Sequence, residues 1–201
     1  ILRKIRASDG SPGVRTTLGG QELSVFDAHC GPPDQGRPGS IIGVRNGAVL
    51  VATGDGSLWI GQARQPNRGG GPSIKLPTAT VIRHQLQGAP TILHDTRAPT
   101  APSSDISYHR TGEVGVVSLD FYNGAMSTAQ CRRLSVAFRR AAAQDTNVLL
   151  LRGGATFSNG IDLNVIEAAQ NPAAESWANI NAIDDLCKAI ITCTNQLIVT
   201  S

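Results

Sequence analysis

The sequence is poor in aromatic residues, which make up 4% of its 201 residues, and it contains a single methionine. So few aromatic side chains leave little for the stacking platforms that bind single-stranded nucleic acids. The net charge of +3 and the isoelectric point of about 8.9 are also milder than the clustered basic charge typical of nucleic-acid-binding domains. We therefore do not expect a nucleic-acid partner.

Patterns typical of metal sites, membrane spans and secretion signals are also missing. No C-x-x-C pair and no histidine at zinc-ligand spacing accompany the four cysteines, which are Cys30, Cys131, Cys187 and Cys193. No run approaches 18 apolar residues, and the first residues lack the apolar core of a signal peptide. We expect a cytoplasmic protein that has reduced thiols, binds no metal and does not associate with a membrane.

Turn-forming residues are concentrated in the first half of the chain, which holds most of its 22 glycines and 11 prolines. The dipeptide Asn46-Gly47 separates the apolar runs 40–44 and 48–53, and both residues accept the positive φ of a type I′ hairpin turn. Residues 1–86 also hold ten Lys and Arg against five Asp and Glu. This punctuation predicts a small antiparallel sheet or barrel over residues 1–86.

The second half alternates apolar strands with amphipathic helices. The expected elements are strands at 113–121 and 147–152 and helices at 127–143, 163–169 and 172–194. Ser127 and Gln130 have the spacing of a capping box, which opens the first of these helices. Helical crossovers connect parallel strands, so residues 112–201 predict an α/β domain. Residues 87–111, including the Pro-rich segment 98–104, are expected to form the linker between two domains.

The segment Gly153–Asn164 connects a predicted strand to a predicted helix and is the best candidate for a functional site. Unpaired backbone N–H groups at such a junction attract negative charge. Gly160 can adopt a conformation closed to other residues and leave the next N–H, that of Ile161, exposed. Such donors stabilise a thioester oxyanion or an enolate. From spacing alone, an ordinary loop capped by Asp162 explains the same residues.

The second half resembles the first half of a crotonase (enoyl-CoA hydratase/isomerase) domain. The resemblance is carried by Val114–Phe121, Asn123–Ser127, Val148–Arg152 and Phe157–Asp162. It implies that Ile161 donates one oxyanion-hole N–H. It also implies that the CoA adenine is held by the residues just before it, namely Phe157, Ser158, Asn159 and Gly160. The second donor of that family would follow the strand that Leu197–Ser201 resembles.

The first half resembles a different family, the formyltransferases that use formyl-tetrahydrofolate. Residues Ile1–Val14, Gly43–Ala48 and Ala52–Ile60 are similar to their C-terminal β-barrel. The resemblance implies that residues 1–86 form a small antiparallel β-barrel, OB-like. The catalytic Asn, His and Asp of that family belong to an upstream domain, so no residue of this chain takes their role. A formyltransferase end joined to a crotonase start is similar to the HypX/HoxX family of hydrogenase maturation factors.

That combined resemblance implies a bifunctional enzyme for [NiFe]-hydrogenase maturation. A formyl group would pass from formyl-tetrahydrofolate, bound in the missing upstream domain, to CoA, and the formyl-CoA would then yield CO. The expected partners are a CoA thioester and other hydrogenase maturation proteins. The chain begins at Ile1 and ends on the strand-like run Ile198–Ser201. We therefore expect an internal fragment of a longer protein. We expect the fragment to be inactive because it has neither the formyltransferase residues nor the second oxyanion donor.

Two other functions stay open on the sequence. The basic excess of residues 1–86 is compatible with the RNA-binding barrel of a tRNA formyltransferase. The second half is compatible with a generic enoyl-CoA hydratase/isomerase that carries an N-terminal extension. Trp59 and Trp177 both fit apolar stripes, so we expect both side chains in the core.

Overall fold

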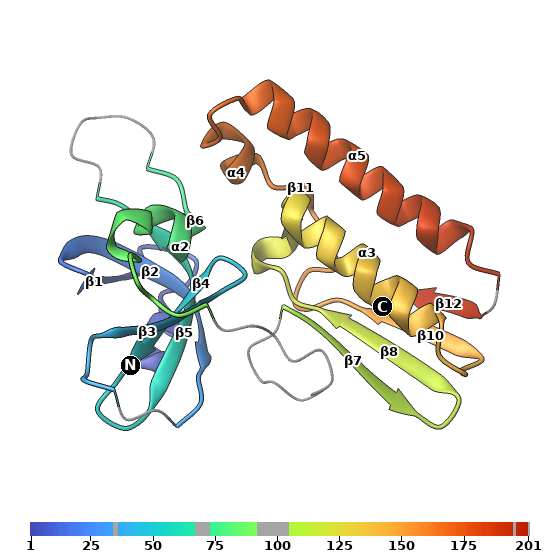
Figure 1. Cartoon of the computed structure of the whole chain (residues 1–201), viewed down its shortest axis with the longest axis horizontal. Helices are drawn as coiled ribbons and strands as arrows, with labels where there is room; N and C mark the ends of the chain where they lie inside the picture. The colour runs from blue at the N-terminus through green and yellow to red at the C-terminus, as the bar shows by residue number, and fades with distance from the viewer. Residues whose placement is uncertain (34–35, 67–72, 92–104, 195, 201) are drawn as a thin grey trace. The chain divides into compact units, whose positions relative to one another are not determined.

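The computed structural model describes the chain except residues 34–35, 67–72, 92–104, 195 and 201. Contacts divide the chain into two compact units, residues 1–95 and residues 96–201 (Figure 1). The predicted linker spanned 87–111, and its Pro-rich part, 98–104, lies outside the described residues. Its last six residues, Ile106–Thr111, form a strand of the second unit. Among the described residues, no helix is long and apolar enough to cross a membrane.

The first unit is an antiparallel sheet accompanied by short helices. Its elements are α1 (Leu2–Ala7), β1 (Val14–Leu18), β2 (Gln21–Cys30), β3 (Ile41–Arg45), β4 (Ala48–Ala52), β5 (Ser57–Arg64), β6 (Leu76–Pro77), α2 (Thr78–Val81) and η1 (Arg83–Gln85). The strands run in the order β1-β2-β5-β4-β3, and β6 pairs with β5. Asn46 and Gly47, with φ of 51° and 87°, form the predicted turn between β3 and β4.

The core of the first unit follows the two-residue period of its strands. Alternate residues of β4 and β5 point to one face, where the buried side chains include Val49, Val51, Leu58 and Ile60. The opposite face of β5 carries Trp59, which is 3% exposed and has the Arg45 guanidinium 4.3 Å from its ring centroid. The prediction that Trp59 is a core residue is confirmed.

The closed OB-like barrel predicted for residues 1–86 is not confirmed. Among the described residues, β1 and β3 are the two ends of the sheet and do not pair with each other. Turn residues predict how many strands form and that neighbours are antiparallel. Closure requires in addition a particular tilt and stagger of the strands, which turn residues do not encode.

The second unit is an α/β unit with the predicted alternation. Its elements are β7 (Ile106–Thr111), β8 (Val114–Leu119), η2 (Tyr122–Gly124), β9 (Ala125–Met126), α3 (Thr128–Ala142), β10 (Val148–Arg152), β11 (Gly160–Ile161), α4 (Leu163–Glu167), α5 (Pro172–Ile191) and β12 (Leu197–Thr200). The main sheet has the order β12-β10-β8-β7, with β7 antiparallel to β8 and the other pairs parallel. As predicted, Ser127 and Gln130 form a capping box at the start of α3.

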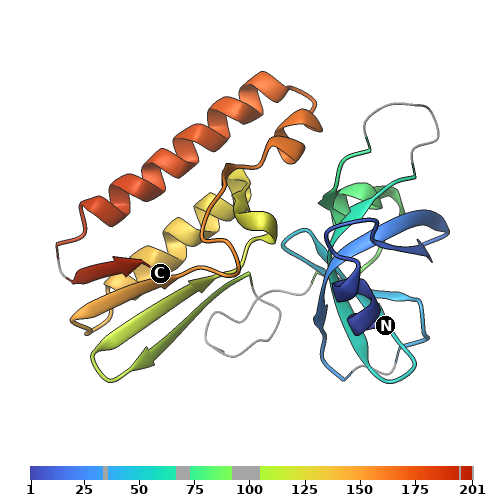
Figure 2. The same ribbon diagram turned by 180° about the vertical axis from the view of Figure 1, so that it is seen from behind.

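Helix α3 packs on β7 and β8, and α5 packs along α3 (Figure 2). The shared core is formed by side chains from the sheet and from both helices, including Val117, Leu119, Cys131, Leu134, Phe138, Leu149, Leu151, Ala182 and Leu186. Leu149 and Leu151 alternate along β10, and Cys131, Leu134 and Phe138 recur at the helical period along α3. This core holds the carboxyl ends of β8 and β10 next to each other, as their parallel register shows.

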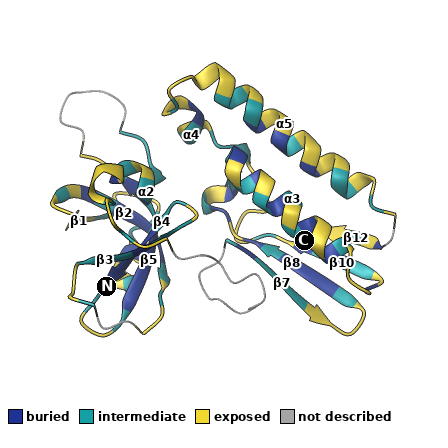
Figure 3. Ribbon diagram, viewed as in Figure 1, coloured by how far each residue is buried: buried dark blue, intermediate teal, exposed yellow. Residues whose placement is uncertain are grey.

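The prediction that Trp177, on α5, is a core residue is wrong. Trp177 and Ile180 are 71% and 42% exposed, whereas the buried residues are Asn179, Ala182 and Leu186. Figure 3 shows most of α5 coloured as exposed. Hydrophobicity favoured the Trp177 face, but the polar side chain of Asn179 is the one that turns toward α3. Ile183 and Ile190 of the same helix do pack against the core.

Candidate functional site

The predicted site segment, Gly153–Asn164, follows the carboxyl end of β10 as a loop and leads into the start of α4. The loop is held in place because Gly160–Ile161 pairs in parallel with Ala125–Met126 as the two-stranded sheet β11-β9. The loop that follows β10 is thus attached to the segment that follows β8. Carboxyl ends of neighbouring parallel strands are the usual position for ligands in α/β sheets.

Asn159 anchors the loop. Its backbone N–H donates to the carbonyl of Gly124 at 2.7 Å, and its Nδ2 donates to the carbonyl of Asn123 at 2.5 Å. Gly160 has a φ of +78°, in the left-handed region, and its N–H donates to Ser158 Oγ at 3.1 Å. Asn159 and Ser158 therefore shape the turn that presents Ile161.

Exposure differs along the loop. Phe157 is 39% exposed and Ser158 is exposed, whereas Gly160 and Ile161 are half-buried. An aromatic side chain left at the surface beside polar groups is available to a flat ligand. The structure thus brings the five predicted site residues into one continuous turn. Their roles in binding CoA and in stabilising an oxyanion stay predictions.

The start of the loop is tightly packed. A Cβ atom added to Gly153 would lie 2.6 Å from the Cα of Phe157, and one added to Gly154 would collide with the carboxylate of Asp120. The first contact requires glycine, because the Phe157 backbone leaves no room for a side chain, whereas the second would displace the end of the Asp120 side chain. Phe157 is therefore held from behind by the backbone at Gly153.

Asn179 of α5 is part of this arrangement, and sequence reasoning missed it. Its side chain is fully buried; Nδ2 donates to the carbonyl of Met126 at 2.9 Å, and Oδ1 accepts from the N–H of Asp162 at 3.2 Å. The N–H of Asp162 also reaches the Met126 carbonyl at 3.2 Å. The available signal was a polar residue three positions before Ala182 and seven before Leu186, on the buried face of the helix.

Asp162 caps α4. Its side chain accepts from the N–H of Val165 at 3.1 Å, as expected for an N-cap residue. Burial raises the pKa of the Asp162 carboxyl above its usual value, and hydrogen bonds from the backbone of Val165 and Asn164 partly oppose this increase. A carboxyl group that resists ionisation therefore lies next to the predicted oxyanion donor.

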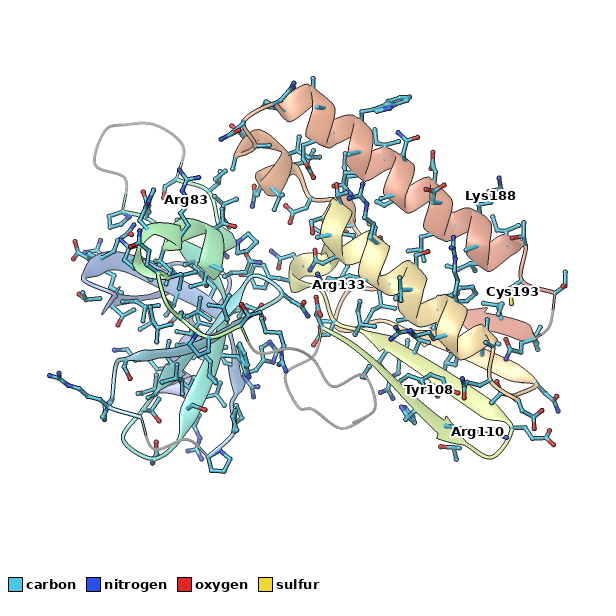
Figure 4. All side chains as sticks on the ribbon, in the orientation of Figure 1. Arg83, Tyr108, Arg110, Arg133, Lys188 and Cys193 are labelled. Carbon is cyan, nitrogen blue, oxygen red and sulfur yellow. The ribbon has the colours of Figure 1, made fainter. Side chains whose placement is uncertain are left out.

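Two side chains of α3, those of Arg133 and Cys131, have structural roles. Arg133, labelled in Figure 4, forms an ion pair with Asp105, which lies just before β7. Burial raises the pKa of Asp105, and the Arg133 charge lowers it to a smaller extent. Cys131 is buried, which raises the pKa of its thiol to about 11. Neither side chain is positioned as a free reactive group.

An open groove of about 530 Å³ lies between the C-terminal parts of α3 and α5. Its lining includes Arg139, Asp185, Lys188 and Cys193, two of which are labelled in Figure 4. None of the predicted site residues lines it. In the part of the chain that the structure describes, no three His, Cys, Asp or Glu side chains come together as a metal site.

Comparison with known proteins matches both units. Residues 1–69 match the family model of the formyl transferase C-terminal domain. Over the whole chain, the sequence is 44% identical to the hydrogenase maturation factor HoxX of Bradyrhizobium diazoefficiens, of which it covers 34%. The crystal structure of HypX from Aquifex aeolicus in complex with tetrahydrofolic acid matches all of this chain, with a TM-score of 0.94 and 37% identity.

The chain covers 36% of that HypX structure, so it spans about a third of the length of both relatives. A methionyl-tRNA formyltransferase of Burkholderia pseudomallei is 34% identical over 100 residues, which are 49% of this chain and 28% of that relative. The similarity to HoxX and HypX extends through both units, whereas the similarity to the tRNA enzyme does not reach across the whole chain.

Proposed function

Because this chain belongs to the HypX/HoxX family, we propose that its full-length protein is a bifunctional enzyme of [NiFe]-hydrogenase maturation. It transfers the formyl group of formyl-tetrahydrofolate to the sulfur of CoA and then converts formyl-CoA to CO. In the second step the carbon–sulfur bond breaks, the formyl hydrogen is lost as a proton, and the thiol of CoA is regenerated. The end-to-end similarity to HoxX and HypX supports this reading, as does the tetrahydrofolic acid bound in the HypX structure.

In this proposal the second unit is the first half of a crotonase-type domain. The Ile161 N–H stabilises the thioester oxygen, and Phe157, Ser158, Asn159 and Gly160 hold the CoA adenine. The observation that carries the assignment is the fixed turn itself: Gly160 is left-handed and the loop is tied to Gly124 and Met126 at a strand-to-helix junction. A donor held in place before the reaction costs no reorganisation when charge develops.

The proposal places the protein in the cytoplasm, where folate and CoA are available, and makes other hydrogenase maturation proteins its partners. The chain has four cysteines without disulfide bonds. Reduced thiols are typical of that compartment.

One observation favours a second candidate, an RNA-binding role for the first unit. The methionyl-tRNA formyltransferase relative is a tRNA enzyme by name, and residues 1–86 carry the basic excess of the chain. Contacts between these basic side chains and RNA phosphates would make the binding strongly dependent on salt. A binding assay with initiator tRNA at low and at moderate salt separates this candidate from the proposed CoA-dependent function.

The deciding experiment supplies the full-length protein with formyl-tetrahydrofolate and CoA and measures formyl-CoA and CO. Both products should form, and both should require the two substrates. Formylation of initiator tRNA, or hydration of an enoyl-CoA without CO release, would contradict the proposed function.

The oxyanion role is tested at Ile161. Ile161→Pro removes the proposed N–H donor and should lower the kcat of CO release about 10²- to 10³-fold, the usual loss for one oxyanion-hole donor. Ile161→Val retains the N–H and is the matched control. Equal activity of the two variants would exclude the Ile161 amide from the reaction.

A further inference from the structure

Asn179 is a buried polar side chain in the middle of α5, where an apolar residue would complete the core. Its neighbours on the same helix face are Ala182 and Leu186, both buried. Burying an amide is costly unless its hydrogen bonds are made, so the contacts of Asn179 account for its presence. Those contacts are all to the segment around the predicted oxyanion donor and to Cys131.

We propose that Asn179 is the positioning residue that holds the Gly160–Ile161 peptide in place for the oxyanion. This inference rests on the proposed function, since it assigns a role within the same site. Asn179 itself touches no reacting atom. It acts through the backbone at Met126 and Asp162, the two groups that its side chain binds.

The geometry restrains the donor from both sides. On one side, the N–H of Asn159 is fixed to the Gly124 carbonyl at 2.7 Å. On the other, the N–H of Asp162 lies 3.2 Å from both the Met126 carbonyl and Asn179 Oδ1. The second restraint consists of these two longer hydrogen bonds from the Asp162 N–H. Asn179 takes part in both, because its Oδ1 accepts one of them and its Nδ2 holds the Met126 carbonyl, the acceptor of the other, at 2.9 Å.

Distance from the chemistry does not make such a restraint unimportant. A displacement of about 1 Å at a catalytic group costs on the order of 100-fold in rate. Removing Asn179 leaves the Met126 carbonyl with one donor fewer and frees the peptide after Ile161 to rotate. The expected consequence is a smaller kcat, with CoA affinity retained, because the hydrogen bonds of the Asn179 side chain go to Met126, Asp162 and Cys131 and not to the CoA-binding residues.

Two controls separate positioning from stability. Thr128 Oγ1 donates to Glu175 Oε1 at 2.6 Å and ties α3 to α5 without touching the loop. Thr128→Val therefore weakens the same helix pair away from the site. Asn181, two residues after Asn179, has an exposed side chain that binds only locally, to the Trp177 carbonyl at 2.6 Å. Asn181→Ala tests the loss of a carboxamide from the same helix.

A conservative variant gives a pH signature. In Asn179→Asp, a protonated carboxyl can still donate to Met126 and accept from Asp162. Burial raises the pKa of such a carboxyl, so it stays neutral at mildly acidic pH. The kcat of Asn179→Asp should approach that of the unmodified protein at low pH and fall as the carboxyl ionises. Asn179→Ala should show no such recovery.

The experiment measures acetyl-CoA affinity, the kcat and KM of CO release, and the infrared carbonyl stretch of bound acetyl-CoA in the full-length protein. Asn179→Ala should lower kcat about 10- to 100-fold with KM changed less than threefold, and should move the carbonyl stretch toward its value in water. Thr128→Val and Asn181→Ala should leave kcat and the carbonyl stretch unchanged.

The outcomes separate failure of the proposed function from failure of the positioning role of Asn179. If the unmodified protein binds no acetyl-CoA and releases no CO, the proposed function and this inference both fail. If the unmodified protein is active but Asn179→Ala matches Thr128→Val in kcat and in carbonyl stretch, the site stands and the positioning role is overturned. An Asn179→Asp variant that is fully active at a pH where its carboxyl is ionised would also overturn it.

Discussion

Substitution of Gly153 by alanine tests how the loop is held. The added Cβ would lie 2.6 Å from the Cα of Phe157 and 3.1 Å from its Cβ, whereas ordinary contacts begin near 3.4 Å. The nearest atom belongs to the backbone, so no side-chain rotation relieves the clash and the turn at Phe157 must move by roughly 1 Å. Overpacking of this kind costs about 1–3 kcal/mol. With a typical urea dependence, the unfolding midpoint should fall by about 1 M.

The assay is urea unfolding of the full-length protein followed by hydrogen exchange, so that the second unit is observed separately. Gly160→Ala is the matched variant, because its Cβ meets no atom within 4 Å but its φ of +78° is strained for alanine. Both variants should lose stability, and Gly153→Ala should speed exchange at the nearby Asn159 amide, which donates to the Gly124 carbonyl. Unchanged stability and exchange in Gly153→Ala would refute the packing argument.

Two other substitutions probe the units separately. Gly61→Ala should destabilise the first unit by about 1–3 kcal/mol in thermal unfolding, because its Cβ would collide with the carboxylate of Asp27. Adding Asp27→Gly removes that carboxylate and should restore part of the lost stability. Asp162→Asn keeps an N-cap acceptor but removes a charge that burial disfavours. Because the native pKa lies above the unfolded value, the folded state binds the extra proton, and the stability of the unmodified protein falls as pH rises between the two values. The variant should therefore match it below about pH 4 and exceed it at neutral pH in denaturant titrations; a constant difference would contradict the assignment.

Local interactions explain what the sequence predicted well. Asn46-Gly47 and the capping box of Ser127 and Gln130 involve residues at most three positions apart, so their pattern is visible without the fold. The alternation of strands and helices after residue 112 is also local, because each element carries its own hydrophobic period. These features placed the site loop between β10 and α4.

Long-range interactions explain what it missed. The face of α5 is selected by Asn179, whose partners lie 53 and 17 residues away in the chain, and the hydrophobic pattern around Trp177 indicated another face. Barrel closure similarly depends on strand stagger. The short helix α1 at Leu2–Ala7 was not anticipated either; its one buried residue, Ile5, joins the core of the sheet. In each case the deciding contact connects distant parts of the chain.

The pairing of β9 with β11 also has a consequence for the order of folding. The ladder joins Ala125–Met126 to Gly160–Ile161, and the chain between them contains all of α3 and β10. The entropy of closing that loop must be recovered by packing α3 on the sheet before two short strands can hold each other. The turn at Gly160 can therefore form only as one of the last native features of its unit. Slow hydrogen exchange at the Asn159 amide, bound to Gly124, would then report that the whole unit had folded.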